Sequence, residues 1–203
     1  YITRPTHENT SWDAYRFEVS AHRWVRLENA SRSWAIANDA TYGWDVTRHQ
    51  NDRRGTWSQV RATLVKSARF PDPDQDQGQH QWNFRIVPDA SVLEAVAAGQ
   101  QINLGEREVS GAPVDAPFSV SGAVVESVAL APDRSGDLVI RLYEAEGGPS
   151  RVTFRAPKAG SVTACDLRYR PSESEPELRG GQGEWSFDLS AFQITTLRVS
   201  FAK

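Results

Sequence analysis

The residues best suited to chemistry lie near the end of a short apolar run in the first half of the chain. Asn38-Asp39 is followed by Tyr42-Gly43, so an amide, a carboxylate and an aromatic ring fall close together. Loops of this kind bind sugars, because amides and carboxylates exchange hydrogen bonds with hydroxyls while an aromatic face covers the apolar side of a pyranose. The same residues suit an Asx-type turn, in which Asn38 and Asp39 bond to nearby backbone. The residues alone leave both interpretations open.

An acidic stretch carries the only pattern that resembles a calcium loop. Asp72, Asp74 and Asp76 alternate and are followed by Gly78. An EF-hand requires glycine directly after the third aspartate and glutamate at the twelfth position, which are Gln77 and Asn83 here. We therefore expect an acidic loop between two strands, and no metal site in this chain.

The histidines and the single cysteine lack the spacing of metal ligands. Cys165 is more than eighty residues from the nearest histidine. Alternation places Cys165 on one strand face with Thr163 and Leu167, which predicts a half-buried packing residue. His22 is predicted to be hydrogen-bonded or on the surface. The four histidines are His7, His22, His49 and His80.

The first half reads as a succession of strands. Apolar and polar residues alternate from Tyr15 to Ala21, Ser33–Ala37 is short and apolar, and the ranges 60–66 and 81–87 have strand character. Six of the seven tryptophans lie before residue 83. Ser91 and Glu94 form a capping box and Gly99 is a stop signal, so one short helix is predicted at about 91–98.

The second half predicts a small antiparallel sandwich of immunoglobulin-like size. The segment 105–117 has two glycines, two prolines and no periodicity, so it is predicted to be a linker. In the last strand the apolar set shifts between Ile194 and Leu197, which predicts a β-bulge. The polar stretch 171–183 is predicted to be a mobile loop. The six predicted strands are 124–131, 138–145, 151–156, 162–169, 184–189 and 192–201.

Five segments in a fixed order resemble the C-terminal β-region of family 38 glycoside hydrolases, the zinc-dependent retaining α-mannosidases. They cover nearly the whole chain. The resemblance implies an all-β fold, in which residues 1–104 form part of a large β-sandwich packed on a catalytic domain and residues 118–203 form a small terminal sandwich. The five segments are Phe17–Trp24, Asn38–Gly43, Asp72–His80, Asp137–Gly147 and Phe192–Phe201.

The resemblance also assigns roles to residues. Asn38, Asp39, Tyr42 and Gly43 match a family motif whose loop lies near the glycone site, so they are the substrate-side candidates. Gly78 and His80 would be architectural. Retaining glycosidases need two carboxylates about 5–5.5 Å apart. In this family the nucleophile and the zinc ligands belong to an N-terminal domain, and nothing here matches their motifs. We expect no catalytic residue in this chain and no activity from it alone.

Charge and composition restrict the partners. A net charge of -3 and a pI near 5.8 argue against nucleic acid. No apolar run approaches the length of a membrane span, and no leader opens the chain, so we expect a cytoplasmic protein. The absence of methionine suggests a piece cut from a longer polypeptide. The expected partners are the catalytic domain, an α-mannoside or oligosaccharide substrate and, through an exposed apolar surface, a second copy.

Two other functions compete with the α-mannosidase interpretation. A free-standing carbohydrate-binding module needs two or three co-planar exposed aromatic rings. A structural interaction domain instead buries its tryptophans and exposes a broad, partly apolar docking face. The exposure of the aromatic side chains is what distinguishes them.

Overall fold

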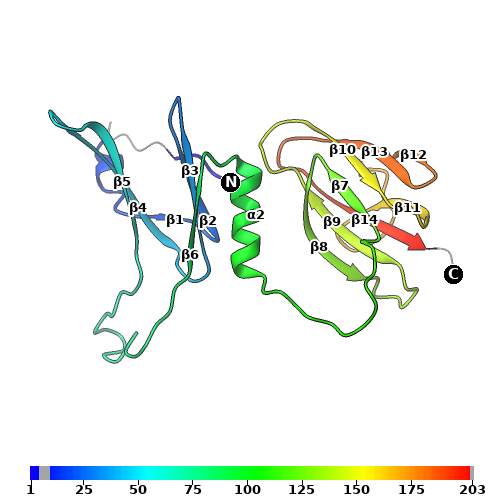
Figure 1. Ribbon diagram of the computed structural model, residues 1–203, viewed down its shortest axis with the longest axis horizontal. Coiled ribbons are helices and arrows are strands. Elements are labelled where there is room, and N and C mark those ends of the chain that lie inside the picture. The colour runs from blue at the N-terminus through cyan, green and yellow to red at the C-terminus, as the bar shows by residue number, and fades with distance from the viewer. Residues whose placement is uncertain (5–9, 202–203) are drawn as a thin grey trace. The chain divides into compact units, whose positions relative to one another are not determined.

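The computed structural model describes residues 1–4 and 10–201, so His7 lies outside the described residues. The chain forms two compact units, Tyr1–Glu108 and Val109–Lys203, and the division between them falls within the segment 105–117 (Figure 1). Neither of the described helices is long and apolar enough to cross a membrane.

The first unit contains two three-stranded antiparallel sheets and two helices. The sheet orders are β1-β4-β5 and β2-β3-β6. The second of these sheets lies between helix α2 and the first sheet (Figure 1). The elements are α1 (Ser11–Ala14), β1 (Val19–Ser20), β2 (Trp24–Glu28), β3 (Ser33–Asn38), β4 (Gly43–Asn51), β5 (Gly55–Ala62), β6 (Phe84–Pro88) and α2 (Val92–Asn103).

Helix α2 begins as the sequence predicts but continues past the predicted end. Ser91 accepts from the Glu94 backbone N–H, and the Glu94 carboxylate accepts from the Ser91 N–H, which is the capping box. Gly99 does not end the helix. A β-carbon there would stand 3.0 Å from Trp24 Cδ1, so the glycine allows the helix to approach β2 closely. The helix ends at Asn103, and the predicted boundary near residue 98 is therefore wrong.

The segment before β2 also differs from its pattern. The alternation from Tyr15 to Ala21 yields only the two-residue strand β1, whose Val19 and Ser20 pair with Trp44 and Gly43. A second helix that the sequence analysis missed, α1, is capped by Thr10, whose hydroxyl accepts from the Asp13 N–H. Tyr15 and Phe17 remain exposed.

The second unit is a sandwich of two four-stranded antiparallel sheets, which confirms the predicted fold class. The sheet orders are β12-β13-β10-β7 and β11-β14-β9-β8. The elements are β7 (Ser119–Ser121), β8 (Val124–Leu130), β9 (Leu138–Tyr143), β10 (Ser150–Arg155), β11 (Ala159–Cys165), β12 (Arg179–Gly181), β13 (Glu184–Leu189) and β14 (Ile194–Phe201).

Alternate residues of the two sheets meet to form one apolar core. Strands β9, β10, β13 and β14 supply the fully buried side chains, which pack as they do in other close-packed interiors. The buried members of this core are Ile140, Leu142, Val152, Phe154, Ala156, Trp185, Phe187, Leu189, Leu197 and Val199.

One expectation for the second unit is wrong. Strand β14 pairs with β9 without interruption from Ile194 to Val199, so there is no bulge between them. The apolar set shifts because buried Thr195, which lies opposite Leu142, occupies an inward position. The stretch 171–183 is a loop apart from the short strand β12, and Glu175 in it accepts a hydrogen bond of 2.7 Å from the Thr195 hydroxyl.

Candidate functional site

Asn38 is the last residue of β3 and shapes the turn that follows. Its Oδ1 accepts hydrogen bonds from the backbone N–H groups of Ala40 (3.2 Å) and Thr41 (2.8 Å), which makes an Asx turn. Its carbonyl accepts from Asn103 Nδ2 at 2.8 Å. The side chain is 2% exposed, and its Nδ2 has no hydrogen-bond partner among the described residues. Asn38 therefore supports the turn and leaves one buried donor unused.

Asp39 connects this turn to the residue that precedes β6. One carboxylate oxygen accepts from the Asn83 backbone N–H at 3.0 Å and the other from Asn83 Nδ2 at 2.6 Å. The backbone N–H of Asn83, and then its side-chain amide, hold the pKa of Asp39 below its ordinary value. Asp39 is therefore an anion near neutral pH, and each of its oxygens keeps lone-pair capacity for another donor.

Tyr42 presents the most accessible ring of the candidate loop. Its side chain is 57% exposed and stacks on the exposed ring of His22, with ring centroids 5.3 Å apart. The Tyr42 carbonyl accepts from the Ala21 N–H at 2.9 Å, which holds the loop against the chain beside β1. A phenol and an imidazole thus lie side by side at the surface.

Gly43 begins β4 beneath the carboxylate of Glu18. A β-carbon at this position would lie 3.1 Å from a Glu18 carboxylate oxygen. Glu18 in turn accepts a hydrogen bond from the Thr63 hydroxyl. The absence of a side chain at Gly43 therefore leaves room for Glu18 beside the loop.

The candidate residues come together with groups that the sequence analysis did not assign to the loop. These are Glu18, Thr63, Asn83 and Asn103. They are distant in the sequence, and only strand pairing and the position of α2 bring them near the turn. The cluster offers carboxylate, amide, phenol and imidazole groups, which bind hydroxylated ligands. The lowered pKa of Asp39 is the opposite of what a general acid would need.

The acidic stretch 72–78 folds as a loop tied to its neighbours. The Asp76 carboxylate accepts from the Ser67 N–H at 3.2 Å, and the Asp76 carbonyl lies 2.9 Å from His80 Nε2. The His80 ring stacks on Trp82. Among residues 1–4 and 10–201, no group of three His, Cys, Asp or Glu side chains gathers closely enough to hold a metal ion. The described residues do not fit a zinc site.

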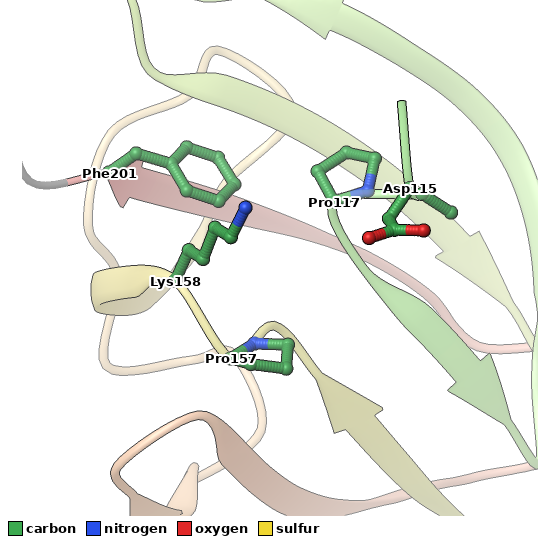
Figure 2. Close-up of a pocket in the computed structure, with 6 residues that line it drawn as sticks. Asp115, Pro117, Pro157, Lys158 and Phe201 are labelled. Atoms are coloured by element: carbon green, nitrogen blue, oxygen red, sulfur yellow. The ribbon is translucent and has the colours of Figure 1, made fainter. Parts of the chain in front are cut away.

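A cavity of about 400 Å³ lies in the second unit, beside the end of β14 (Figure 2). It brings together one carboxylate and one ammonium group over prolines and a phenyl ring, so it lacks the second carboxylate that glycoside hydrolysis needs. Its lining residues are Asp115, Ala116, Pro117, Pro157, Lys158 and Phe201.

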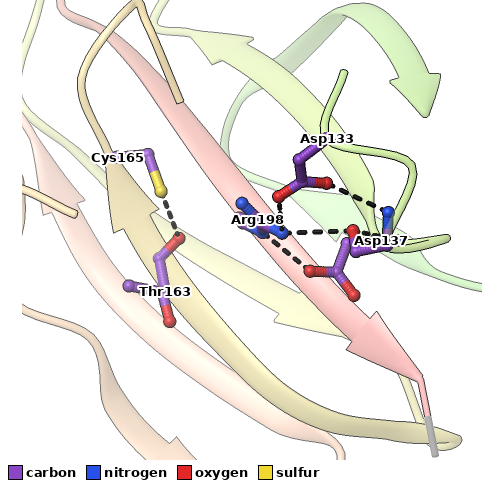
Figure 3. Close-up of polar contacts among 6 residues, drawn as sticks. Asp133, Asp137, Thr163, Cys165 and Arg198 are labelled. Carbon is purple, nitrogen blue, oxygen red and sulfur yellow. Dashed lines mark hydrogen bonds and ion pairs between the residues drawn. The ribbon is translucent and has the colours of Figure 1, made fainter. Parts of the chain in front are cut away.

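Charged side chains on the outer face of the second unit are paired with one another (Figure 3). Arg198 of β14 donates to Asp137 at 2.7 Å and to Asp133 at 2.6 Å. Hydrogen bonds from Ser135, and then from Arg198, lower the pKa of Asp133 to about 2. Nearby Cys165 is fully buried, whereas the sequence predicts a half-buried packing residue, and burial raises the pKa of its thiol. These contacts stabilise the sandwich.

Glu144 binds the turn at the other end of the sandwich. Its carboxylate is buried and accepts from the backbone N–H groups of Glu146 (2.5 Å), Gly147 (2.8 Å) and Phe192 (2.9 Å). Burial acts to raise its pKa, but these N–H groups together hold the pKa below its usual value. The Tyr-Glu-Ala segment of the sequence therefore has an architectural role.

The two β units and the polar turn after β3 do not by themselves identify the class of protein. Comparison with known proteins gives the class. Residues 1–74 match the glycosyl hydrolases family 38 C-terminal domain, and residues 122–197 match the family 38 C-terminal beta sandwich domain. The chain belongs to the C-terminal region of the family 38 glycoside hydrolases.

Curated relatives match nearly the whole chain. It is similar to alpha-mannosidase 2C1 of Homo sapiens (34% identity, 97% of this chain, 19% of the relative) and to alpha-mannosidase G of Dictyostelium discoideum (29%, 98% and 19%). It is also similar to an alpha-mannosidase of Saccharomyces cerevisiae (30%, 98% and 20%). The chain spans about a fifth of the length of these relatives.

Proposed function

We propose that this chain is the non-catalytic C-terminal β-region of a zinc-dependent, retaining α-mannosidase. The observation that carries the proposal is the order of the two family matches, 1–74 and then 122–197, within a chain aligned almost end to end with proteins named alpha-mannosidase. The catalytic carboxylates and the zinc site then belong to another part of the same polypeptide. This region supports that part and does not itself cleave the glycosidic bond.

We propose further that the turn after β3 lies on the substrate side of the enzyme. Asn38 and Asp39 shape and anchor the turn, and Tyr42 is the group free to meet a sugar. Its exposed ring, backed by His22, supports this role. The Asp39 carboxylate retains lone pairs for a sugar hydroxyl although it already accepts from Asn83. The ligand in this proposal is an α-mannoside or an oligosaccharide that ends in one.

The free-standing carbohydrate-binding module is the weaker alternative. Trp44 and Trp185 are buried, and Trp34 lies on a sheet face among aliphatic residues. Tyr42, Trp57 and Trp82 each stack on a histidine in a separate pair. This pattern favours a supporting domain with a docking face over a platform of co-planar rings.

The compartment proposed for the enzyme is the cytoplasm. The single cysteine supports it, because one thiol cannot form an internal disulfide of the kind common in secreted domains. Cell fractionation of the native protein is the measurement, and recovery in a membrane-bound or secreted fraction would contradict the proposal.

The test of the function compares the polypeptide encoded by the complete gene with the 203-residue chain. The complete polypeptide should hydrolyse an aryl α-mannoside with retention of configuration and lose activity when zinc is chelated. The 203-residue chain should be inactive. Turnover by the repurified 203-residue chain, or none by the complete polypeptide, would overturn the proposal. Submillimolar binding of mannose to the 203-residue chain would favour the carbohydrate-binding module.

A further inference from the structure

One face of the β1-β4-β5 sheet lacks a side chain at Gly43. Strand pairing places Ser20 of β1 directly opposite Gly43, and residues that lie opposite each other share a sheet face. On the other side of Gly43, the Thr63 backbone N–H donates to the Gly43 carbonyl at 2.9 Å. The reverse face carries Trp44, which is buried and meets Phe84 edge to face. We call the face that holds Ser20 and Gly43 the Gly43 face.

The Glu18 carboxylate lies over the position where Gly43 has no side chain. A β-carbon at Gly43 would stand 3.1 Å from Glu18 Oε1 and 3.2 Å from its Oε2, so glycine is what leaves the carboxylate this place. The Thr63 hydroxyl donates to Oε1. Oε2 accepts no hydrogen bond from residues 1–4 and 10–201. Glu18 is therefore an exposed carboxylate that is held in one position and keeps acceptor capacity for a ligand.

The other carboxylate of the Gly43 face is already paired. Asp45 lies two residues after Gly43 in β4, so it points to the same side of the sheet. Its carboxylate accepts from Arg61 Nη2 at 2.7 Å and from the Thr47 hydroxyl at 2.8 Å. These contacts join neighbouring positions of β4 and β5. On this face Glu18 is the carboxylate that remains available to a ligand.

A fixed pair of aromatic rings lies next to Gly43. The Tyr42 ring stacks on His22, with ring centroids 5.3 Å apart, and both side chains are exposed. The Ala21 N–H donates to the Tyr42 carbonyl at 2.9 Å, and the His22 carbonyl accepts from the Trp24 N–H at 2.9 Å. Arg23 between them has a φ of 68°, a strained conformation of the kind that gathers at ligand sites. The backbone thus holds the His22 ring in place.

We propose that Glu18 is a specificity-determining residue of the substrate site, where its carboxylate accepts hydrogen bonds from hydroxyls of the bound sugar beside Tyr42. The inference rests on the proposed function, from which it takes an α-linked mannose unit as the ligand. The two oxygens of one carboxylate accept from two neighbouring hydroxyls of a pyranose, and the His22 imidazole adds a donor and an acceptor. An exposed phenol ring covers the apolar side of the sugar.

The contrast with Asn38 and Asp39 favours Glu18 for this role. Asn38 Oδ1 and both oxygens of Asp39 accept hydrogen bonds that hold the turn after β3. Glu18 accepts one hydrogen bond, from a hydroxyl, and none from the backbone of the turn. Its carboxylate disfavours an anionic ligand through like-charge repulsion. Among the described residues no acidic or imidazole cluster is suited to a metal ion, so a neutral, hydroxylated ligand fits best.

Binding of sugars that lack single hydroxyls tests the proposal without relying on catalysis. Methyl α-mannoside and the derivatives that each lack one of its hydroxyls are titrated into the complete polypeptide, and calorimetry gives each Kd. The variants are Glu18→Ala and Glu18→Gln; the glutamine amide oxygen can still accept from the Thr63 hydroxyl. Glu106→Ala is the matched control, because Glu106 is an exposed glutamate of the segment 105–117.

Glu18→Ala should weaken the binding of methyl α-mannoside by about ten- to a hundredfold, because hydrogen bonds to a carboxylate are lost, and Glu18→Gln should weaken it less. Glu106→Ala should leave the Kd unchanged. Removal of the contacted hydroxyl should weaken binding to the unaltered polypeptide and have no further effect in Glu18→Ala, since its partner is then absent.

A role for Glu18 in folding the loop alone would weaken the binding of all these sugars by the same factor, and that result would overturn the proposal. Unchanged affinity of Glu18→Ala would overturn it as well, as would the absence of binding to the unaltered polypeptide. Binding that depends on Glu18 in a polypeptide that does not hydrolyse α-mannosides would support this inference and refute the proposed function separately.

Discussion

Asp39 directs both of its carboxylate oxygens at one residue, Asn83, which lies 44 positions later in the sequence. The pair closes the turn after β3 onto the entry to β6. We expect Asp39→Ala to destabilise the first unit by about 1–2 kcal/mol, since the hydrogen bonds are charge-assisted but partly open to water. Urea unfolding of Asp39→Ala, Asn83→Ala and the double variant measures the coupling. Additive effects in this cycle would show that the pair does not stabilise the turn.

Tyr42 should affect catalysis in the complete enzyme without affecting the fold. Tyr42→Phe removes one hydroxyl from an exposed ring, and loss of a neutral hydrogen bond to a sugar corresponds to about a two- to tenfold decrease in kcat/KM. Tyr15→Phe makes the same chemical change at another exposed ring and should leave kcat/KM unchanged. Steady-state kinetics and thermal melting of both variants are the measurements. Unchanged kinetics with Tyr42→Phe would remove this residue from the substrate side.

The Arg198 network should make the stability of the second unit depend on acid pH. The folded pKa of Asp133 is about 2, below the ordinary value of 3.8. A lowered pKa means that the carboxylate contributes stability above about pH 4 and loses it as the pH falls towards 2. Arg198→Met should therefore destabilise the unit more at pH 6 than at pH 2.5.

Hydrogen exchange of peptides from β9 and β14 at the two pH values gives this comparison. Arg155→Met is the control, because Arg155 pairs with Glu184 at an exposed site away from Asp133. An effect of Arg198→Met that is as large at pH 2.5 as at pH 6 would contradict the electrostatic explanation.

Glu144→Gln should destabilise the sandwich by about 1–3 kcal/mol, because an amide cannot accept all three backbone N–H bonds and leaves buried donors unpaired. Glu146→Gln lies two residues away on the exposed side of the turn and should have little effect. Hydrogen exchange of peptides from β9 and β14 at increasing denaturant concentration reports on this unit. Equal stability of the two variants would show that the buried carboxylate is not needed.

Limited proteolysis should separate the units within 105–117. Every side chain in this segment is exposed, and Arg107 is a tryptic site. The stretch 171–183 should resist, since β12 pairs with β13 and Glu175 holds Thr195. Trypsin should release two resistant pieces, and Arg107→Gln should delay that cut. Initial cleavage confined to 171–183 would contradict this domain boundary.

Patterns within a few neighbouring residues correctly predicted the features that depend on interactions between those residues. The capping box at Ser91 marked the start of α2, and alternation located most strands of the second unit. The prediction that Gly99 ends the helix was wrong, because the glycine is required for close packing on Trp24 and not for a turn. The prediction of a β-bulge in the last strand was wrong because Thr195, a polar residue, occupies a position that faces inward.

The surroundings of the candidate loop could not be predicted in the same way. The sequence suggested Asn38 as a turn residue, and the Asx turn is present. Nothing near Asp39 in the sequence identifies Asn83 as its partner, and nothing near Gly43 identifies Glu18 as the side chain above it. Both contacts arise from strand pairing between distant segments, which a single sequence does not specify.

The burial of Cys165 makes the reaction rate of its thiol a measure of opening in the second unit. The chain has one cysteine, and it lies in β11 opposite Thr196 of β14. Strand β11 is an edge strand of its sheet, so a thiol reagent reaches the buried Sγ through local opening at this edge. The rate of modification of the unaltered chain therefore reports on that opening in the second unit. Acid, heat or separation of the two units can thus be followed in one half of the molecule without introducing any label.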